Sequence, residues 1–305
     1  MSAVASKRRS GLLRREALDG YLFIGPWVLG FLLWVAGPML FSLALVFMNW
    51  SILTPPTFAG LANLRQLVTD QFVGISLVNT AYYTVLFVPL HVLLALLAAL
   101  ALNVRVRGIG VYRTLFYLPS ITPAVASVIL WLWVFDPDFG VVDILLRKLH
   151  LPAPSWFVDP TWAKPALVIM ALWGLGSAMI IFLAGLQNIP QELYEAAGID
   201  GAGWWSRFWA VTLPTLSPVL FFNVVVGIIG SFQVFTSAFI ISNGAGGPDN
   251  STLFLVLYLY QNGFQYFHMG YASAIAWLLF VIVLIFTGLQ FLGARRWVHY
   301  EGRLS

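Results

Sequence analysis

Six long apolar stretches divide the chain, and none of them contains Asp, Glu, Lys or Arg. A helix needs about 20 apolar residues to cross a bilayer, and one charge at its middle costs about 2.5–3.5 kcal/mol of insertion free energy. The pattern therefore predicts an all-α, polytopic membrane protein with six transmembrane helices. Pro38, Pro89 and Pro123 lie within the stretches, where membrane helices tolerate proline. The six stretches cover residues 22–48, 77–102, 115–135, 165–186, 216–242 and 272–292.

The composition supports this interpretation. Of the 305 residues, 60% are hydrophobic and 9% are charged, whereas soluble domains carry about 25% charged residues. So much apolar surface requires lipid as its solvent. The 13 Trp and 24 Phe residues suit aromatic belts at two membrane interfaces. The chain has no Cys, which excludes disulfides, thiolate chemistry and Cys-ligated zinc.

The basic residues predict the orientation, because Lys and Arg concentrate in cytoplasmic segments. Of the 16 Lys and Arg residues, twelve fall on the side of the two termini, which places both termini in the cytoplasm. We interpret the N-terminal basic run as an orientation signal near anionic lipid, since nucleic-acid binding needs a clustered basic face. The twelve are Lys7, Arg8, Arg9, Arg14, Arg15, Arg105, Arg107, Arg113, Arg207, Arg295, Arg296 and Arg303, and the other four are Arg65, Arg147, Lys148 and Lys164.

The first apolar stretch is predicted to be a retained helix. It is longer than the apolar core of about 7–15 residues in a signal peptide. No small-x-small cleavage pattern follows it, because the next residues are Asn49 and Trp50. The chain should therefore cross the membrane from its first stretch onward.

The external segments carry polar residues but predict no catalytic or metal site. Segment 136–164 is rich in Asp and Pro, yet it lacks the spacing of an EF-hand and a nearby His. We expect a solvated loop packed by Trp156 and Phe157. Segment 243–250 is a strong turn signal, and it is not a phosphate loop because no Lys follows and no strand precedes it.

The cytoplasmic segment between the fourth and fifth stretches differs from the other loops. Pro190 suits the first turn of a helix over residues 191–197, and the glycines of 198–203 should break it. An aromatic second helix then starts at Trp204, and Pro214 is expected to end it. The result is a compact knob with its aromatic face at the membrane surface. A DNA-binding helix-turn-helix is set aside because Arg207 is its one basic residue.

This segment resembles the EAA loop of bacterial ABC-importer permeases. The pattern is Glu-Ala-Ala, three residues, Gly, nine residues, an aliphatic residue, one residue and Leu-Pro. It departs mildly from the family at Val211, where Ile is favoured. The matching residues are Glu195, Ala196, Ala197, Gly201, Val211, Leu213 and Pro214.

Around the loop, nearly the whole chain resembles the MalF-type carbohydrate permeases. The large external insertion and the additional N-terminal helices of the maltose permease itself are missing. Residues 21–37 resemble the first helix of these permeases, and Leu118 and Pro119 followed by Pro123 resemble the entry of their third helix. Residues 246–248 and 269–274 resemble the stretch before their last helix.

The resemblance implies a type I ABC-importer permease fold in the bacterial cytoplasmic membrane. It implies a second homologous permease, two ATPase subunits that carry ATP and Mg, and an extracytoplasmic solute-binding protein. The loop 189–214 would couple to the ATPase through Glu195, Ala196, Ala197, Gly201, Leu213 and Pro214. The sequence has no Gly-x4-Gly-Lys-Ser/Thr, so we expect no ATP hydrolysis, no catalytic residue and no cofactor on this chain. The domains are 1–21, a basic tail; 22–71, the first helix and external loop; 72–292, the permease core; and 293–305, a cytoplasmic tail.

A sugar path needs groups that pair with hydroxyls and a flat aromatic face. The fourth and fifth stretches offer both, and the resemblance places the path on these two helices. The alternative is interhelical packing by small polar residues. His91 is interpreted as a satisfied interhelical residue, since no acid lies in the spans to exchange a proton with it. The path candidates are Ser231, Phe232, Gln233, Thr236, Trp173 and Ser177.

Other membrane-protein classes fit less well. An ion-coupled secondary transporter, which is the alternative function, usually carries acids within its spans. A channel needs a repeated filter or a charged ring, and an intramembrane enzyme needs a nucleophile–base or metal set. Importers of oligosaccharides, monosaccharides and glycerol phosphate share the loop. The spans have no basic residue, which favours an unphosphorylated sugar.

Overall fold

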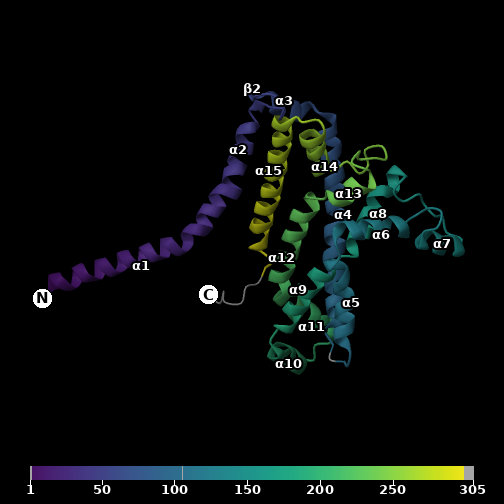
Figure 1. Cartoon of the computed structure of the whole chain (residues 1–305). Coiled ribbons are helices and arrows are strands. Elements are labelled where there is room, and N and C mark those ends of the chain that lie inside the picture. Colours follow the sequence, from purple (N-terminus) through teal and green to yellow (C-terminus); the bar gives the residue numbers. More distant parts are fainter. Residues whose placement is uncertain (1, 105, 299–305) are drawn as a thin grey trace.

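The computed structural model describes residues 2–104 and 106–298, with side chains from residue 16 onward. Long helices run side by side (Figure 1). Helices α10 (Gln191–Ile199) and α11 (Trp204–Arg207) lie at one end, and α3 (Ala62–Thr69) and β2 (Thr57–Phe58) lie at the other. Strands β1 (Met48–Asn49) and β2 (Thr57–Phe58) form one antiparallel hairpin, with Met48 opposite Phe58. The basic run 7–15, Arg105 and Arg303, which contribute to the predicted orientation, lie outside the described side chains.

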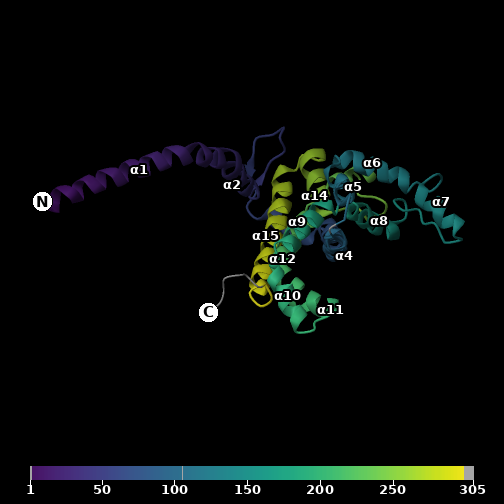
Figure 2. The same cartoon turned by 90° about the horizontal axis from the view of Figure 1, so that it is seen from below.

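The first predicted span is one helical rod with a π-helical turn in it. It comprises α1 (Ser2–Phe31), η1 (Leu32–Ala36) and α2 (Gly37–Leu45). The turn lies directly before Pro38, which has no N–H for an ordinary helical bond. A Cβ on Gly37 would lie 2.9 Å from the Leu32 carbonyl oxygen, so glycine suits this close approach. α1 extends away from the other helices in both views (Figures 1 and 2).

Helix α4 (Gln71–Leu102) is the centre of the packing. Asp70 begins it by accepting a hydrogen bond from the Phe72 N–H at 2.8 Å. Ala95 and Ala99 are fully buried, which lets α9 and α12 approach closely. The predicted end at residue 102 is confirmed, whereas the helix begins six residues before the predicted start.

The third predicted span is broken, so the expectation of one helix over 115–135 is wrong. Helices α5 (Ile109–Ile121) and α6 (Ala124–Val134) meet at 100°. Pro123 pushes the residue before it out of the helical region, and Thr122 has ψ 133°. Pro123 therefore ends one helix and turns the chain sharply, so the span is not a single helix.

The fourth and fifth predicted spans also contain breaks. Helices α8 (Pro160–Leu172) and α9 (Gly176–Gln187) meet at 47°. A Cβ on Gly176 would lie 2.4 Å from the Phe116 carbonyl oxygen, so the α5 and α9 backbones touch there. Helix α12 (Leu213–Phe232) stops before residues 233–235, and α13 (Thr236–Ile241) follows.

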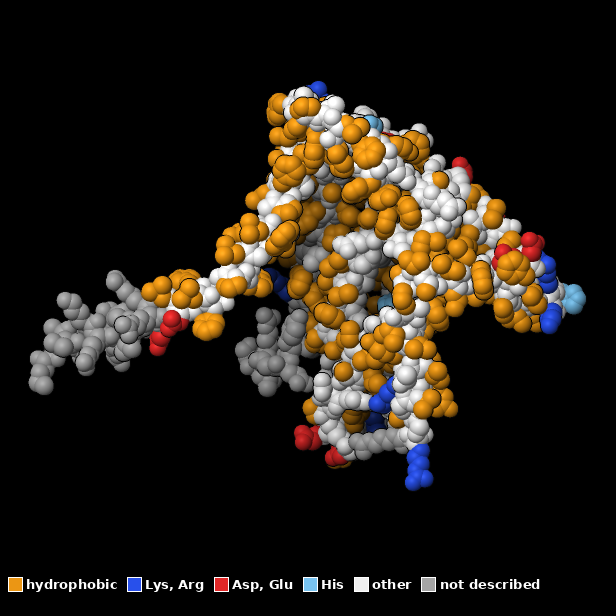
Figure 3. Space-filling view, in the orientation of Figure 1, with side chains coloured by type: hydrophobic (Ala, Val, Ile, Leu, Met, Phe, Trp, Pro, Cys, Tyr) orange, Lys and Arg blue, Asp and Glu red, His pale blue; other side chains and the backbone are white. Residues whose placement is uncertain are grey.

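The lengths of the described helices fit four to six crossings. Four helices are long and apolar enough alone: Glu16–Leu45, Gln71–Leu102, Trp204–Ile241 and Met269–Ala294, the last of which is α15. The two bent pairs raise the number to six if each is one span. Hydrophobic side chains cover much of the visible body, while charged side chains gather towards the ends and on the projecting α7 segment (Figure 3).

The segments predicted to be external contain short helices: α3 (Ala62–Thr69), α7 (Val141–Lys148), α14 (Leu255–Tyr260) and η3 (Gln261–Gln265). Trp156 and Phe157 pack with Phe135, as expected. Asp143 is not solvated, however: it is 1% exposed and accepts a hydrogen bond from Trp156 Nε1 at 2.7 Å. Among the described residues, no group of three or more His, Cys, Asp or Glu could hold a metal ion.

Candidate functional site

The predicted knob is present at the end of the molecule opposite the hairpin (Figures 1 and 2). It consists of α10 (Gln191–Ile199), a turn, α11 (Trp204–Arg207) and the π-helical turn η2 (Phe208–Thr212). The predicted break is confirmed, although the first helix continues two residues further than expected. We call residues 189–214 the coupling loop after the role that the resemblance implies, and that role stays a prediction.

The turn between the two helices requires glycine at one position. Gly201 has φ +75°, in the left-handed region. Its N–H donates to the Gly198 carbonyl at 3.1 Å, and the Ala202 N–H donates to the Ala197 carbonyl at 2.9 Å. This pair of bonds is the Schellman motif, which satisfies the last carbonyls of a helix and favours glycine at its left-handed residue. The glycine of the family pattern thus has a structural reason.

Two side-chain interactions hold the knob together. Arg207 Nε donates to the Ala202 carbonyl at 2.8 Å. A Cβ on Gly198 would lie 3.1 Å from the Arg207 guanidinium, so Gly198 leaves room for that group. The Tyr194 and Thr212 hydroxyls lie 2.9 Å apart and join α10 to η2. These interactions give the loop a defined conformation.

The outer face of α10 is small, acidic and partly apolar. Glu195 and Ala196 are exposed, and Ala197 is half-buried. Ile199 is 88% exposed at the tip. On the next helix Trp204, Trp205 and Trp209 are exposed around Phe208, as an interfacial aromatic face requires.

Pro214 does not end the second helix, so that expectation is wrong. The chain is helical from α11 through η2 into α12, and the Leu213 N–H donates to the Phe208 carbonyl across the π-helical turn. Such a turn suits the residue before a proline, since it shifts the bonding pattern that proline interrupts. Leu213 and Pro214 thus lie inside a continuous helix that joins the knob to the fifth span.

Three helix breaks meet at one cavity of about 380 Å³. Thr122 comes from the α5–α6 break, Trp173 from the α8–α9 break, and Phe235 from the α12–α13 break. Broken helices in membranes are tolerated where they line a cavity or lie within protein. The structure brings the candidates Trp173, Ser177 and Thr236 together here.

The lining of this cavity carries free hydroxyl groups. Within the described residues no hydrogen bond engages the hydroxyls of Ser127, Ser177, Thr236 and Ser237. Trp173 adds an aromatic surface and meets Trp131 edge-on at 6.1 Å between ring centroids. No charged residue lines the cavity. The arrangement suits a neutral ligand with hydroxyl groups.

The other three candidates lie outside this cavity. Ser231 is 1% exposed and donates to Thr84 Oγ1 at 3.0 Å, which joins α12 to α4. Phe232 is buried against Phe286, with ring centroids 5.5 Å apart. Gln233 is exposed at the break after α12. A role for these residues on the path stays a prediction.

A second cavity of about 340 Å³ adjoins the first, because Ser177 and Val234 line both. His91 lines it, and the His91 Nδ1 is buried without a hydrogen bond in the described part of the chain. The expected interhelical partner is therefore missing for this nitrogen. Sequence reasoning did not single out Asn223, which also lines this cavity.

At the end of the molecule predicted to be external, Asp70 joins three helices. The hydroxyls of Tyr258 and Tyr271 donate to its Oδ2, the second at 2.6 Å, and the Phe72 N–H donates to its Oδ1. Burial opposes ionisation, but these hydrogen bonds outweigh it and hold the Asp70 pKa below its ordinary value. Burial, with the hydrogen bond to Asp70, raises the pKa of Tyr258 to about 12. Sequence reasoning missed this cluster, since no local pattern marks it.

Comparisons with known proteins identify the family to which the chain is similar. Residues 91–299 match the family model described as binding-protein-dependent transport system inner membrane component. The chain is 44% identical to the probable ABC transporter permease protein YesP of Bacillus subtilis, over 97% of this chain and 96% of that one. It is 36% identical to the lactose transport system permease protein LacF of Rhizobium radiobacter, over 96% and 99%. A chain of a bacterial alginate ABC transporter, solved with an alginate-bound periplasmic protein, has the same fold at TM-score 0.76, 23% identity and coverage of 97% and 98%.

Proposed function

The chain belongs to the family of binding-protein-dependent transport system inner membrane components, and from this premise we propose that it forms half of the translocation path of an ATP-driven carbohydrate importer. The other half is a second homologous permease. Two ATPase subunits bind below and an extracytoplasmic solute-binding protein delivers the sugar. Two similar proteins support a saccharide as substrate: the permease of a lactose transport system and the chain of the alginate transporter.

The observation that carries the proposal is the convergence of three helix breaks on one hydroxyl-lined cavity. Membrane transporters bind substrate at interrupted helices near the middle of the bilayer. Sugar hydroxyls would exchange hydrogen bonds with Ser127, Ser177 and Thr236, and the Trp173 ring would cover an apolar sugar face. A cavity without charged residues suits an unphosphorylated sugar.

The predicted topology is consistent with the same assignment. Six crossings with both termini in the cytoplasm would put residues 189–214 on the side that has ATP. The protein then resides in the bacterial cytoplasmic membrane, with residues 72–292 as the permease core between the two tails.

The coupling loop is connected to the cavity by one continuous helix. The helix that starts at Trp204 continues through Pro214 and ends at Phe232, directly before the break that lines the cavity. A movement of α10 driven by the ATPases would therefore shift this helix as a body. ATP and Mg bind on those subunits, and this chain supplies the docking face around Glu195 and Ala196.

An ion-coupled secondary transporter is the competing function, and copurification separates the two. The tagged chain is expressed with its neighbouring genes and isolated in mild detergent. The proposal expects an ATPase and a second permease to copurify in fixed ratio. A chain that is isolated alone and transports sugar on an ion gradient would refute it.

A further inference from the structure

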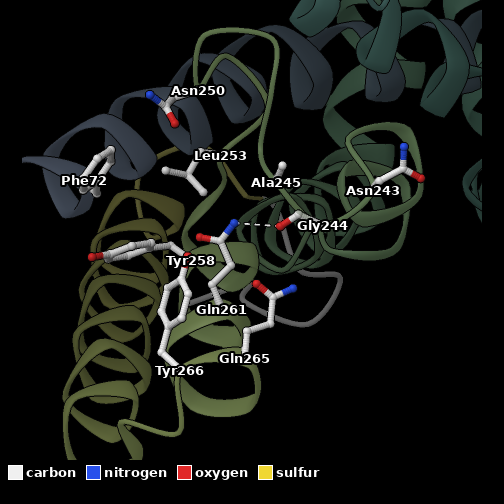
Figure 4. A pocket seen from close by; sticks show the side chains of 10 residues that line it. All are labelled: Phe72, Asn243, Gly244, Ala245, Asn250, Leu253, Tyr258, Gln261, Gln265 and Tyr266. Atoms are coloured by element: carbon white, nitrogen blue, oxygen red, sulfur yellow. Dashed lines mark hydrogen bonds between the residues drawn. The ribbon is translucent and has the colours of Figure 1, made fainter.

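The segment between the fifth and sixth predicted spans builds a cavity of about 460 Å³ that the proposed path does not use. It lies where α4 begins, at the end of the molecule opposite the coupling loop. Asn243 stands on one side and Tyr258 on the other, with Gln261 and Gln265 between them (Figure 4). Residues 243–250, which the sequence predicts to be a turn, thus form one wall of a pocket.

The lining of this cavity is neutral and rich in amides. It contains no Asp, Glu, Lys, Arg or His. Side-chain amides both donate and accept hydrogen bonds, so they pair with neighbouring hydroxyl groups of a sugar. Aromatic rings pack against the apolar face of a sugar ring. Four amides and the rings of Tyr258 and Tyr266 occur together here: the amides belong to Asn243, Asn250, Gln261 and Gln265.

One buried amide keeps a free acceptor. Gln261 is 6% exposed, and its Nε2 donates to the Gly244 carbonyl at 2.7 Å. No hydrogen bond within the described residues reaches its Oε1, which points away from Gly244 (Figure 4). The side-chain amides of Asn243 and Gln265 are likewise unengaged in the described chain, and both residues are exposed.

The walls are fixed before any ligand binds. Asn79 Nδ2 donates to the Asn250 carbonyl at 2.7 Å and to the Leu253 carbonyl at 3.1 Å. Thr252 Oγ1 donates to the Gly247 carbonyl at 2.7 Å. Tyr258 is held by Asp70. A preorganised pocket loses little conformational entropy on binding, which favours a specific ligand.

We propose that this cavity is an external receiving site that binds one or two units of a neutral saccharide before it enters the membrane path. The proposal rests on the proposed function for the sugar and for the side of the membrane, and it adds a second binding position. The volume lies in the range of small-molecule sites, about 300–1,000 Å³.

Saturation-transfer NMR on the complete transporter in nanodiscs, without the solute-binding protein, tests the site. Lactose, maltose and trehalose serve as probes, and uptake of the same sugars is measured in proteoliposomes with the binding protein present. Asn243→Gly keeps the left-handed backbone (φ +50°) while removing the amide, and Gln265→Leu removes a second one. We expect the double variant to weaken binding of an imported sugar about tenfold, since each lost hydrogen bond contributes about 0.5–1.5 kcal/mol. Gln66→Leu, an exposed residue of α3 outside the cavity, should change nothing.

Three results would overturn the inference. Saturation transfer that survives the double variant but disappears in Thr236→Val would place all binding in the membrane path, and the proposed function would stand. Loss of affinity for the solute-binding protein with unchanged sugar binding would make the pocket a protein contact. Absence of both binding and uptake for every sugar would refute the proposed function together with this site.

Discussion

Arg207 Nε donates a hydrogen bond to the Ala202 carbonyl at 2.8 Å, across the turn that separates the two helices of the coupling loop. The guanidinium lies against Gly198, where a side chain would displace it. The bond holds the turn against the helix that continues into the fifth span, and the guanidinium brings the same side chain against Gly198 of α10. If the loop couples to an ATPase, as proposed, this contact would keep the two helices in a fixed relation.

Gly201→Asp should uncouple transport from ATP hydrolysis. Gly201 has a left-handed backbone, and a side chain there strains the Schellman turn, though Asp tolerates this conformation better than most residues. The measurement is sugar uptake together with the ATPase rate of the assembled transporter. We expect uptake to fall at least tenfold while the abundance of the chain stays the same.

Gly203→Asp is the matched control for this experiment. Gly203 lies two residues away in the same turn, at φ −71°, and a Cβ there meets nothing within 4 Å. Uptake should stay near the wild-type level. Equal loss in both variants, or normal uptake in Gly201→Asp, would contradict the role given to the turn.

Thr236→Val should weaken sugar uptake while leaving assembly and basal ATPase activity intact. Valine keeps the shape of threonine but removes a hydroxyl that faces the 380 Å³ cavity. A lost hydrogen bond to a sugar corresponds to about 0.5–1.5 kcal/mol, or up to about tenfold in affinity. Thr114→Val, at an exposed threonine outside that cavity, is the control.

Gln233→Leu provides a comparison at the break itself. If Gln233 contributes to the path, the variant lowers uptake as Thr236→Val does. Unchanged uptake in both variants would leave the polar residues of this region with a packing role alone.

The Asp70 cluster makes stability at the external end depend on acid pH. The pKa of Asp70 is lower in the folded protein than its ordinary value, so its contribution is complete above about pH 4. It is lost as the pH falls through the folded-state pKa. Thermal unfolding of the purified transporter between pH 3 and pH 7 measures this loss. We expect Asp70→Asn to unfold at a lower temperature than wild type at pH 7, with the difference shrinking below pH 4; a difference independent of pH would contradict the assignment.

The sequence predicts those helices whose ends follow from the length of an apolar stretch. It does not predict the bends at prolines or the contacts between residues far apart in the chain. The end of α4 at Leu102 follows from the charge pattern alone. Pro123 turns the chain by 100°, whereas Pro214 is absorbed by a π-helical turn, and no rule based on proline itself separates these outcomes. They depend on the packing of the neighbouring helices.

The candidate sites also differ in whether the sequence predicts them. The coupling loop is predictable because its turn is local and Gly201 marks it. The Asp70 cluster is not, since 188 residues separate Asp70 from Tyr258 and 201 separate it from Tyr271. The cavity is intermediate: Trp173, Ser177 and Thr236 could be selected by chemistry, but their meeting depends on three helix breaks.

The most direct test of the account is uptake in proteoliposomes that contain this chain, its partner permease and the ATPase subunits, with the solute-binding protein and labelled sugar outside. The account predicts accumulation of sugar only when ATP and Mg are inside, and its loss when Gly201→Asp replaces the wild-type chain. Accumulation without ATP, driven by a proton or sodium gradient across vesicles that contain this chain alone, would contradict it.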